Sequence, residues 1–141
     1  MANTMKLQII TPMRTILDVE VESVILNTTE GEMGVLYDHE PVVTLLGYKD
    51  IVYTQGGQKK KATALGGFAE ITKDRVTILT DASELADEID LERAKKAKER
   101  AEKRLASKES GIDHLRAEIA LKKAIARINL REGALMKCQN P

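Results

Sequence analysis

The sequence predicts an α+β chain in two parts, an N-terminal β-sandwich followed by a C-terminal antiparallel two-helix hairpin. Up to about residue 84, short runs of β-forming residues alternate with turn residues, and seven of the nine glycines lie there. After that point Ala, Glu, Lys, Arg and Leu dominate, and all of these are typical of helices. Residues 1–83 contain 8 Lys and Arg against 11 Asp and Glu, whereas residues 84–141 contain 14 against 11. We therefore expect domains at 1–84 and 85–141.

The first part is expected to contain only strands. Eight runs rich in β-forming residues recur at the short spacing of an all-β sandwich or barrel. These runs are residues 7–10, 21–26, 34–36, 42–45, 51–53, 62–65, 68–71 and 75–79. The intervals are too short for a helix of three turns, which argues against βαβ units.

The second part is expected to contain two helices. The first begins at about Asp87 or Asp90 and ends at about Ala106, and the second covers about 112–130 or slightly more. The short break at 107–111 predicts an antiparallel hairpin, with Ser110 or Asp113 capping the second helix.

Small residues recur on one side of each predicted helix, which lets two helices approach closely. They are Ala94, Ala97 and Ala101 on the first helix and Ala117, Ala120 and Ala124 on the second. Such an interface buries little apolar area, so we expect a marginally stable hairpin that can open.

Composition argues against several functions. Hydrophobic residues make up 43% and charged residues 31%, so the chain can bury a core. A formal net charge of zero and only 3% aromatic residues argue against nucleic-acid binding. One Cys and two His argue against a disulfide framework and a metal site. Cys138 reads as a tail thiol, and the chain shows no nucleophile motif, so we expect no catalytic residues.

Targeting signals are also missing from the sequence. No apolar run is long enough to span a bilayer, and the first residues resemble neither a signal peptide nor a transit peptide. We expect a soluble, cytoplasmic protein with no direct membrane insertion.

Both predicted helices carry a stripe of basic residues within about 80° of one another. The stripes are Arg93, Lys96, Arg100 and Arg104 on the first helix and Arg116, Lys123, Arg127 and Arg131 on the second. Each stripe alone is typical of a solvated face. Two stripes side by side would repel unless an anion lay between them, and a nucleoside triphosphate or an acidic segment of a partner would fit. Asp90 lies one turn before Arg93, where it could order that side chain or accept from a ribose or a base amine.

Several motifs resemble those of the ε subunits of bacterial F-type ATP synthases. They are residues 6–12, 31–46, 65–71, 76–81 and 89–94, and the resemblance covers residues 5–131 in one order. It implies a ten-stranded sandwich and a two-helix domain. It also implies a non-catalytic subunit at the foot of the central stalk, which couples the rotor to the catalytic head and inhibits ATP hydrolysis through mobile helices. The implied partners are the gamma subunit, the c-ring and the alpha/beta head, on the cytoplasmic face of the bacterial membrane.

The resemblance further implies that ATP is a regulatory ligand favouring the folded-down hairpin, with the role of Mg²⁺ left open. The residues implied for the nucleotide are Glu84, Ile89, Asp90, Arg93, Ala94, Arg100, Lys123 and Arg127. Relatives commonly have Arg where Lys123 stands, so a bidentate phosphate contact becomes a point charge.

Partner contacts are implied at both ends of the chain. Glu32, Met33 and His39 are expected to contact other subunits from the sandwich, although His39 alone reads as a loop histidine bonded to nearby backbone. The family usually has Pro where this chain has Tyr37, Asn or Gly where it has Asp38, and Ala where it has Glu40. These differences bear on contacts to the c-ring or gamma. The helical candidates are Arg116, Lys122 and Arg131, with Lys123 and Arg127, directed at an acidic segment of the β subunits.

Three alternatives remain. The first is a coupling and regulatory subunit whose hairpin contacts only protein and binds no nucleotide, which the lysine at 123 supports. The second is a nucleic-acid-binding module that uses the basic hairpin, and the third is an enzyme of unknown type. The composition and the absent catalytic motifs argue against the last two.

Overall fold

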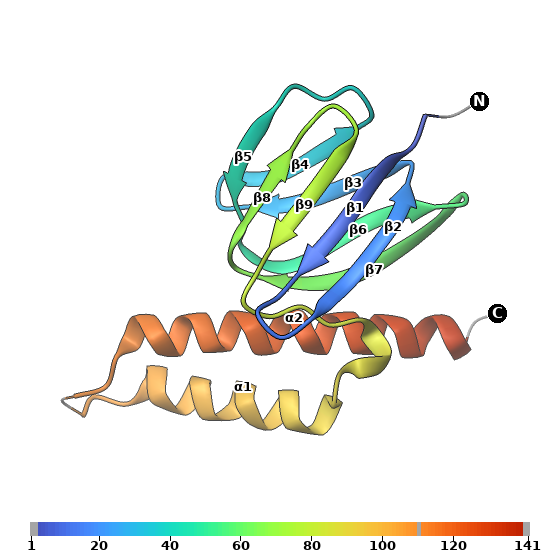
Figure 1. Ribbon diagram of the computed structural model, residues 1–141. Helices are drawn as coiled ribbons and strands as arrows, with labels where there is room; N and C mark the ends of the chain where they lie inside the picture. Colours follow the sequence, from blue (N-terminus) through green and yellow to red (C-terminus); the bar gives the residue numbers. More distant parts are fainter. Residues whose placement is uncertain (1–2, 110, 140–141) are drawn as a thin grey trace. The chain divides into compact units, whose positions relative to one another are not determined.

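The computed structural model describes residues 3–109 and 111–139 (Figure 1). The chain forms two compact units, Met1–Leu85 and Ala86–Pro141, so the division falls one residue after the expected boundary. The first unit contains the strands and the second contains the helices.

The N-terminal unit is a sandwich of two stacked sheets (Figure 1). In spatial order, the five-stranded sheet contains β2 (Thr15–Val21), β1 (Met5–Ile10), β9 (Arg75–Leu79), β8 (Phe68–Ile71) and β5 (Val42–Leu45). The four-stranded sheet contains β4 (Gly31–Leu36), β3 (Ser23–Thr28), β6 (Tyr48–Gln55) and β7 (Gln58–Leu65). Neighbouring strands are antiparallel except β1 and β9, which are parallel.

The core lies between the two sheets. Alternate residues of a strand point to opposite faces, and in β1 the buried ones are Met5, Leu7 and Ile9. The other sheet contributes side chains such as Val24 and Leu26 from β3. Burial of this apolar area, at roughly 25 cal/mol per Å², is the main stabilising contribution to the sandwich.

The predicted strand 21–26 is confirmed for residues 23–26, but it joined the ends of two strands, because the chain changes sheets at Glu22. Val21 pairs with Met5 in one sheet, and Ser23 starts the next strand in the other sheet. The Glu22 carboxylate accepts hydrogen bonds from the backbone N–H groups of Gly56 and Gly57, each at 3.1 Å. The first strand of this pair, β2, begins at residue 15, and the sequence analysis missed its first six residues.

The expected tenth strand is also absent, since the described residues form nine. Residues 82–85, here called the strap, run along β7, and the Thr63 N–H donates to the Glu84 carbonyl at 3.0 Å. The Glu84 N–H, however, donates to the Thr63 hydroxyl at 2.8 Å, and the Ser83 hydroxyl donates to the Thr63 carbonyl. Side-chain hydroxyls therefore take the place of the backbone groups that would pair in a strand, and only an isolated β-bridge forms, between Ala62 and Leu85.

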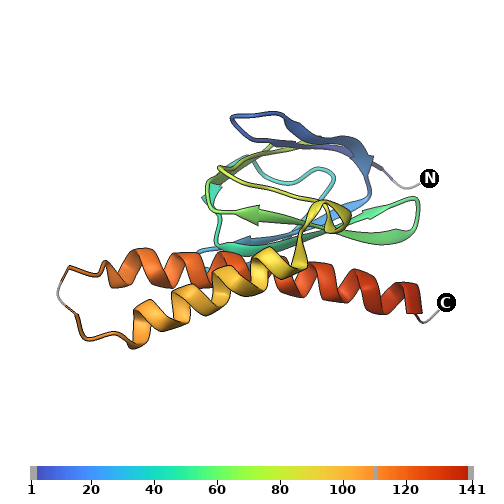
Figure 2. The ribbon, with the colours of Figure 1, turned by 90° about the horizontal axis from the view of Figure 1, so that it is seen from below.

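The C-terminal unit is a helical hairpin in which α1 and α2 pack side by side and antiparallel (Figure 2). It contains the short 3-10 helix η1 (Ala86–Glu88), α1 (Leu91–Ala106) and α2 (His114–Gln139). The first helix agrees with the predicted start at Asp90 and the predicted end.

The second helix differs from its prediction at both ends. Asp113 accepts the Arg116 N–H at 3.0 Å and caps α2, while Ser110, the alternative cap, lies outside the described residues. The helix continues to Gln139, about nine residues further than expected. Gly133 does not end it, because one glycine costs only about 1 kcal/mol within a long run of helix formers.

Alanines line the contact between the helices, although not all of those predicted. Ala94 and Ala101 on α1 and Ala117 and Ala124 on α2 are buried. Ala120 is exposed, which corrects the prediction, since it lies about 60° around the helix from Ala117. Ala97 is half-buried.

Candidate functional site

The start of α1 is built by the motif at 89–94. Asp90 has an extended backbone, and its carboxylate accepts the N–H of Arg93 at 3.1 Å, which caps the helix. Ile89 and Ala94 are buried, whereas the Asp90 and Arg93 side chains face solvent. Asp90 therefore orders the backbone of Arg93, and its exposed carboxylate retains further lone pairs for a ligand.

The two basic stripes lie on the same face of the hairpin. On a helical wheel, Arg93 and Arg100 lie about 90° to one side of the buried Ala94 and Ala101. On α2, the basic stripe also lies about 90° from the buried Ala117 and Ala124. The two stripes are displaced in the same rotational direction when each helix is viewed from its own N-terminus. Because the helices are antiparallel, both stripes point to one side of the interface.

Two contacts show how the helices are aligned. At one end, Lys95 Nζ lies 3.7 Å from Glu132 Oε1, on the side of the hairpin opposite the stripes. At the loop end, His114 Nε2 lies 3.4 Å from the carbonyl oxygen of Ser107. Antiparallel helices held at both ends have a defined register, within about one turn of 5.4 Å.

This register selects which basic residues lie opposite each other. Lys123 lies level with Arg100, and Arg127 lies level with the first two turns of α1, in each case to within about one turn. Arg116 is two residues beyond His114, so it lies near the loop end of α1. The centre of the shared basic face is therefore formed by Arg93, Lys96 and Arg100 with Lys123 and Arg127, and Arg104 and Arg116 lie towards the loop.

The predicted partner contacts of α2 do not gather on one surface. Lys122 is exposed but lies on the opposite side of α2 from the stripe. Arg131 is half-buried, and its Nη1 donates to the Ala86 carbonyl at 3.3 Å. Arg116 and Lys122 therefore lie on separate surfaces of α2, and Arg131 is hydrogen-bonded within the hairpin.

Glu84, the remaining residue implied for the nucleotide, belongs to the N-terminal unit. Its Oε2 accepts from the Thr63 hydroxyl at 3.3 Å, and the Glu84 carbonyl oxygen accepts the Thr63 N–H at 3.0 Å. The place of this carboxylate is thus determined by β7.

The three partner residues predicted in the sandwich have different environments. Glu32 is exposed on β4, which is an edge strand, while Met33 is half-buried and packs against the core. His39 Nδ1 lies 2.7 Å from the carbonyl oxygen of Glu40, so the interpretation as a loop histidine bonded to nearby backbone is confirmed.

Sequence analysis missed an exposed apolar strip on the outer face of the five-stranded sheet. Val43 and Leu45 on β5 are 65% and 63% exposed, and Phe68 lies directly opposite Leu45 on β8. Contiguous exposed apolar side chains mark interaction surfaces. A signal was present, because the segment 42–46 is apolar at nearly every position, which is typical of a strand covered on both faces.

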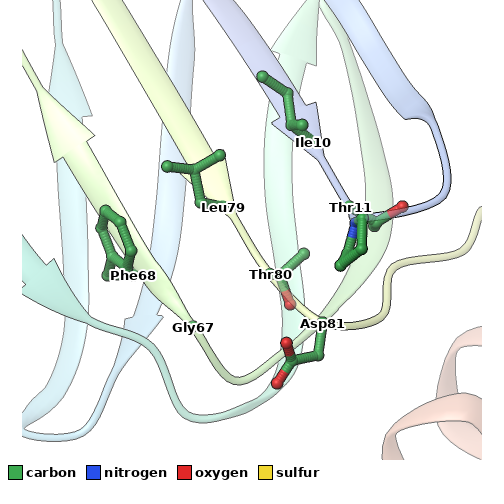
Figure 3. A pocket seen from close by; sticks show the side chains of 8 residues that line it. Ile10, Thr11, Gly67, Phe68, Leu79, Thr80 and Asp81 are labelled. Atoms are coloured by element: carbon green, nitrogen blue, oxygen red, sulfur yellow. The ribbon is translucent and has the colours of Figure 1, made fainter.

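An open pocket of about 350 Å³ lies where β1, β8 and β9 meet (Figure 3). Its lining residues are Ile10, Thr11, Pro12, Gly67, Phe68, Leu79, Thr80 and Asp81. Asp81 is the one charged residue in the lining, and it is an anion. The pocket therefore does not suit a phosphate.

Two further searches of the described residues gave no candidates. They contain no group of three or more His, Cys, Asp or Glu that could hold a metal ion. None of their helices is long and apolar enough to cross a membrane.

The fold is that of a two-part chain, a β-sandwich joined to a long helical hairpin. Residues 4–86 match the family model of the ATP synthase delta/epsilon chain β-sandwich domain. Residues 87–131 match the long α-helix domain of the same chain. The chain therefore belongs to the ATP synthase delta/epsilon chain family, and the resemblance seen in its motifs is confirmed.

Curated relatives match along nearly their whole length. The ATP synthase epsilon chain of Desulforamulus reducens is 47% identical over 132 residues, which are 94% of this chain and 100% of the relative. That of Desulfitobacterium hafniense (strain Y51) is 45% identical over 129 residues, 92% of this chain and 97% of the relative.

Solved structures show the same fold. A chain in the cryo-EM structure of the Euglena gracilis mitochondrial ATP synthase is 31% identical, with a TM-score of 0.77, and the match covers 94% of this chain and 81% of that one. A chain in the Tetrahymena thermophila central stalk and c-ring structure has a TM-score of 0.53 at 14% identity and supports the fold alone.

Proposed function

We propose that this chain is the epsilon-type subunit in the central stalk of a bacterial ATP synthase, and that ATP binds its hairpin and favours the folded-down state. Family membership and the epsilon-chain relatives support the first half, and they make the chain a non-catalytic subunit of the complex. Its partners are then the gamma subunit, the c-ring and the alpha/beta head. The complex holds it peripherally at the cytoplasmic face of the membrane, where it couples the rotor to the head.

In this proposal, the sandwich makes the permanent contacts with the other subunits. The apolar strip of Val43, Leu45 and Phe68 offers a surface for another subunit, and the exposed Glu32 on the edge strand β4 offers a polar contact. We assign the apolar strip to the gamma subunit and Glu32 to the polar loops of the c-ring.

The observation that carries the nucleotide proposal is the pairing of basic residues across the hairpin. Helices packed through alanines lie roughly 8–10 Å apart, so like charges at the same level repel. A triphosphate between the helices would bind Arg93 and Arg100 from α1 together with Lys123 and Arg127 from α2. Asp90, at the start of α1, remains for the nucleoside end.

Binding energy sets how far ATP shifts the hairpin. A ligand stabilises the state that it binds by RT ln(1 + [L]/Kd), which is roughly 1.4 kcal/mol at ten times Kd. Because the alanine interface between the helices is weak, this binding free energy is enough to change the ratio of closed to open hairpin about tenfold. When ATP is scarce, the hairpin opens and its basic residues become available to an acidic segment of the head, which inhibits hydrolysis.

Calorimetric titration of ATP and of ADP into the full chain, with and without Mg²⁺, tests the proposal. We expect saturable binding that prefers ATP. Arg100→Ala should weaken it at least tenfold, whereas Arg116→Ala, on the α2 stripe but about two turns from Lys123 towards the loop, should change it less than twofold. Lys123→Arg should tighten binding, since a guanidinium can hold a phosphate bidentately.

No heat at millimolar ATP would contradict the nucleotide proposal and favour a hairpin that contacts only protein. The lysine at 123 is the observation that supports this second candidate. Equal weakening by Arg100→Ala and Arg116→Ala would contradict the assigned site and indicate a general electrostatic effect.

A further inference from the structure

Arg131 closes the end of the hairpin that the loop does not join. Its Nη1 lies 3.3 Å from the Ala86 carbonyl oxygen, which also accepts the Ile89 N–H at 3.2 Å. The side chain is half-buried. A guanidinium on α2 is therefore bonded to the turn from which α1 begins.

The next residue of α2 contacts the other side of the same region. Glu132 lies 3.7 Å from Lys95, one turn into α1. Both of these side chains are about half exposed, and exposed ion pairs contribute little. The Arg131 bond is charge-assisted and less exposed to water, so it is the stronger of the two contacts.

We propose that Arg131 is an internal latch, which holds the C-terminal part of α2 to the start of α1 without any nucleotide. The covalent loop keeps the other end of the hairpin together, so separation must begin at the Arg131 end. Arg131 can contact a partner only after its bond to Ala86 breaks. This inference rests on the proposed function only for the consequence of opening, which is the inhibition of hydrolysis.

This latch differs from the basic face in its chemistry. The basic face brings like charges together and, in the proposed function, binds an added anion, whereas Arg131 is bonded to a carbonyl of the chain itself. The closed hairpin thus has stabilising contacts that are independent of nucleotide, the Arg131 bond and the Lys95–Glu132 ion pair among them.

Hydrogen exchange of the full chain in the absence of nucleotide tests the latch. Arg131→Met removes the donor but keeps an apolar stem, and Arg116→Met is the matched control on the same helix. An α2 end released from α1 is marginally stable as an isolated helix, so its amides exchange faster. We expect Arg131→Met to speed exchange about three- to tenfold at residues 128–135 and 86–91, and Arg116→Met to leave both segments within twofold of the original chain.

Exchange in the sandwich is the internal reference, since a misfolded variant would change it as well. Glu132→Gln should change exchange at 128–135 less than twofold. Unchanged exchange in Arg131→Met would overturn the latch, as would equal acceleration by Arg116→Met. Repeating the comparison with ATP separates the two proposals, because a chain that ignores ATP can still show the effect of Arg131→Met.

Discussion

Gly67 lies where the chain enters β8 and passes very close to the end of β9. Its φ is +89°, and a Cβ built on it would lie 2.1 Å from the Leu79 carbonyl oxygen. Both the left-handed backbone and the space therefore require glycine.

We expect Gly67→Ala to destabilise the sandwich by roughly 2–4 kcal/mol, because the clash is with backbone and the conformation is strained. Urea denaturation followed by far-ultraviolet circular dichroism measures the loss. Gly34→Ala is the matched control, since an added Cβ there meets nothing within 4 Å and φ is not positive. Similar losses in both variants would contradict the close-approach argument.

Asp50 gives the sandwich a pH dependence at the scale of one residue. Burial raises the pKa of this carboxyl above its usual value of 3.8, and the positive charges of Lys61 and Lys49 only partly oppose the shift. The folded chain therefore holds this proton to a higher pH than the unfolded chain does. The stability that the group contributes is present below pH 3.8 and is lost as the pH rises through the folded pKa.

We expect Asp50→Asn to become more stable relative to the original chain as the pH rises from about 4 to 7, because asparagine does not ionise. Thermal denaturation of both chains at these two pH values measures the difference, and the other carboxyls cancel in the comparison. A difference that stays constant with pH would contradict the assignment.

At the scale of the element, β7 is an edge strand with two different halves. Its first four residues are exposed and its last four, which the strap covers, are buried. The uncovered half contains Lys59, Lys60 and Lys61. Charged residues on an open edge prevent its unpaired backbone groups from pairing with another chain.

We expect the triple variant Lys59→Thr, Lys60→Thr and Lys61→Thr to self-associate at concentrations where the original chain does not. Threonine favours strands and removes the repulsion between two such edges. Light scattering after size-exclusion chromatography measures the mass. The corresponding triple arginine variant keeps the charge and should behave like the original chain, so association of both variants, or of neither, would contradict this role.

At the scale of the whole molecule, the two units should respond differently to salt. The basic residues are concentrated in the helical half, and the register places like charges opposite each other across the hairpin. Charges roughly 8–10 Å apart repel by about 0.5 kcal/mol per pair in water, and salt near 0.2 M screens most of this.

We expect added KCl, from about 20 to 200 mM, to slow hydrogen exchange in the hairpin about twofold and to leave the sandwich unchanged. Faster exchange with salt would show that the attraction between Lys95 and Glu132 outweighs the repulsion between the stripes. Equal responses of both units would contradict the pairing of the stripes.

The sequence by itself determined the features that depend on neighbours along the chain. The change of hydrophobic period divided it into strands and helices, and Asp90 and Asp113 were readable as caps because a cap needs only the next turn. The motif at 89–94 and the other matching segments were sufficient to indicate the family. Both basic stripes followed from helical spacing alone.

Only the tertiary structure decided what depends on residues remote in the chain. The change of sheet at Glu22, the bonding of Thr63 to the strap and the exposure of β5 all require knowing which strands become neighbours. The same holds for the hairpin, where the level of Arg100 relative to Lys123 and the bond from Arg131 to Ala86 follow from how two helices align. Periodicity records which face of an element is apolar, but the pairing and register of elements are set by packing across the whole unit.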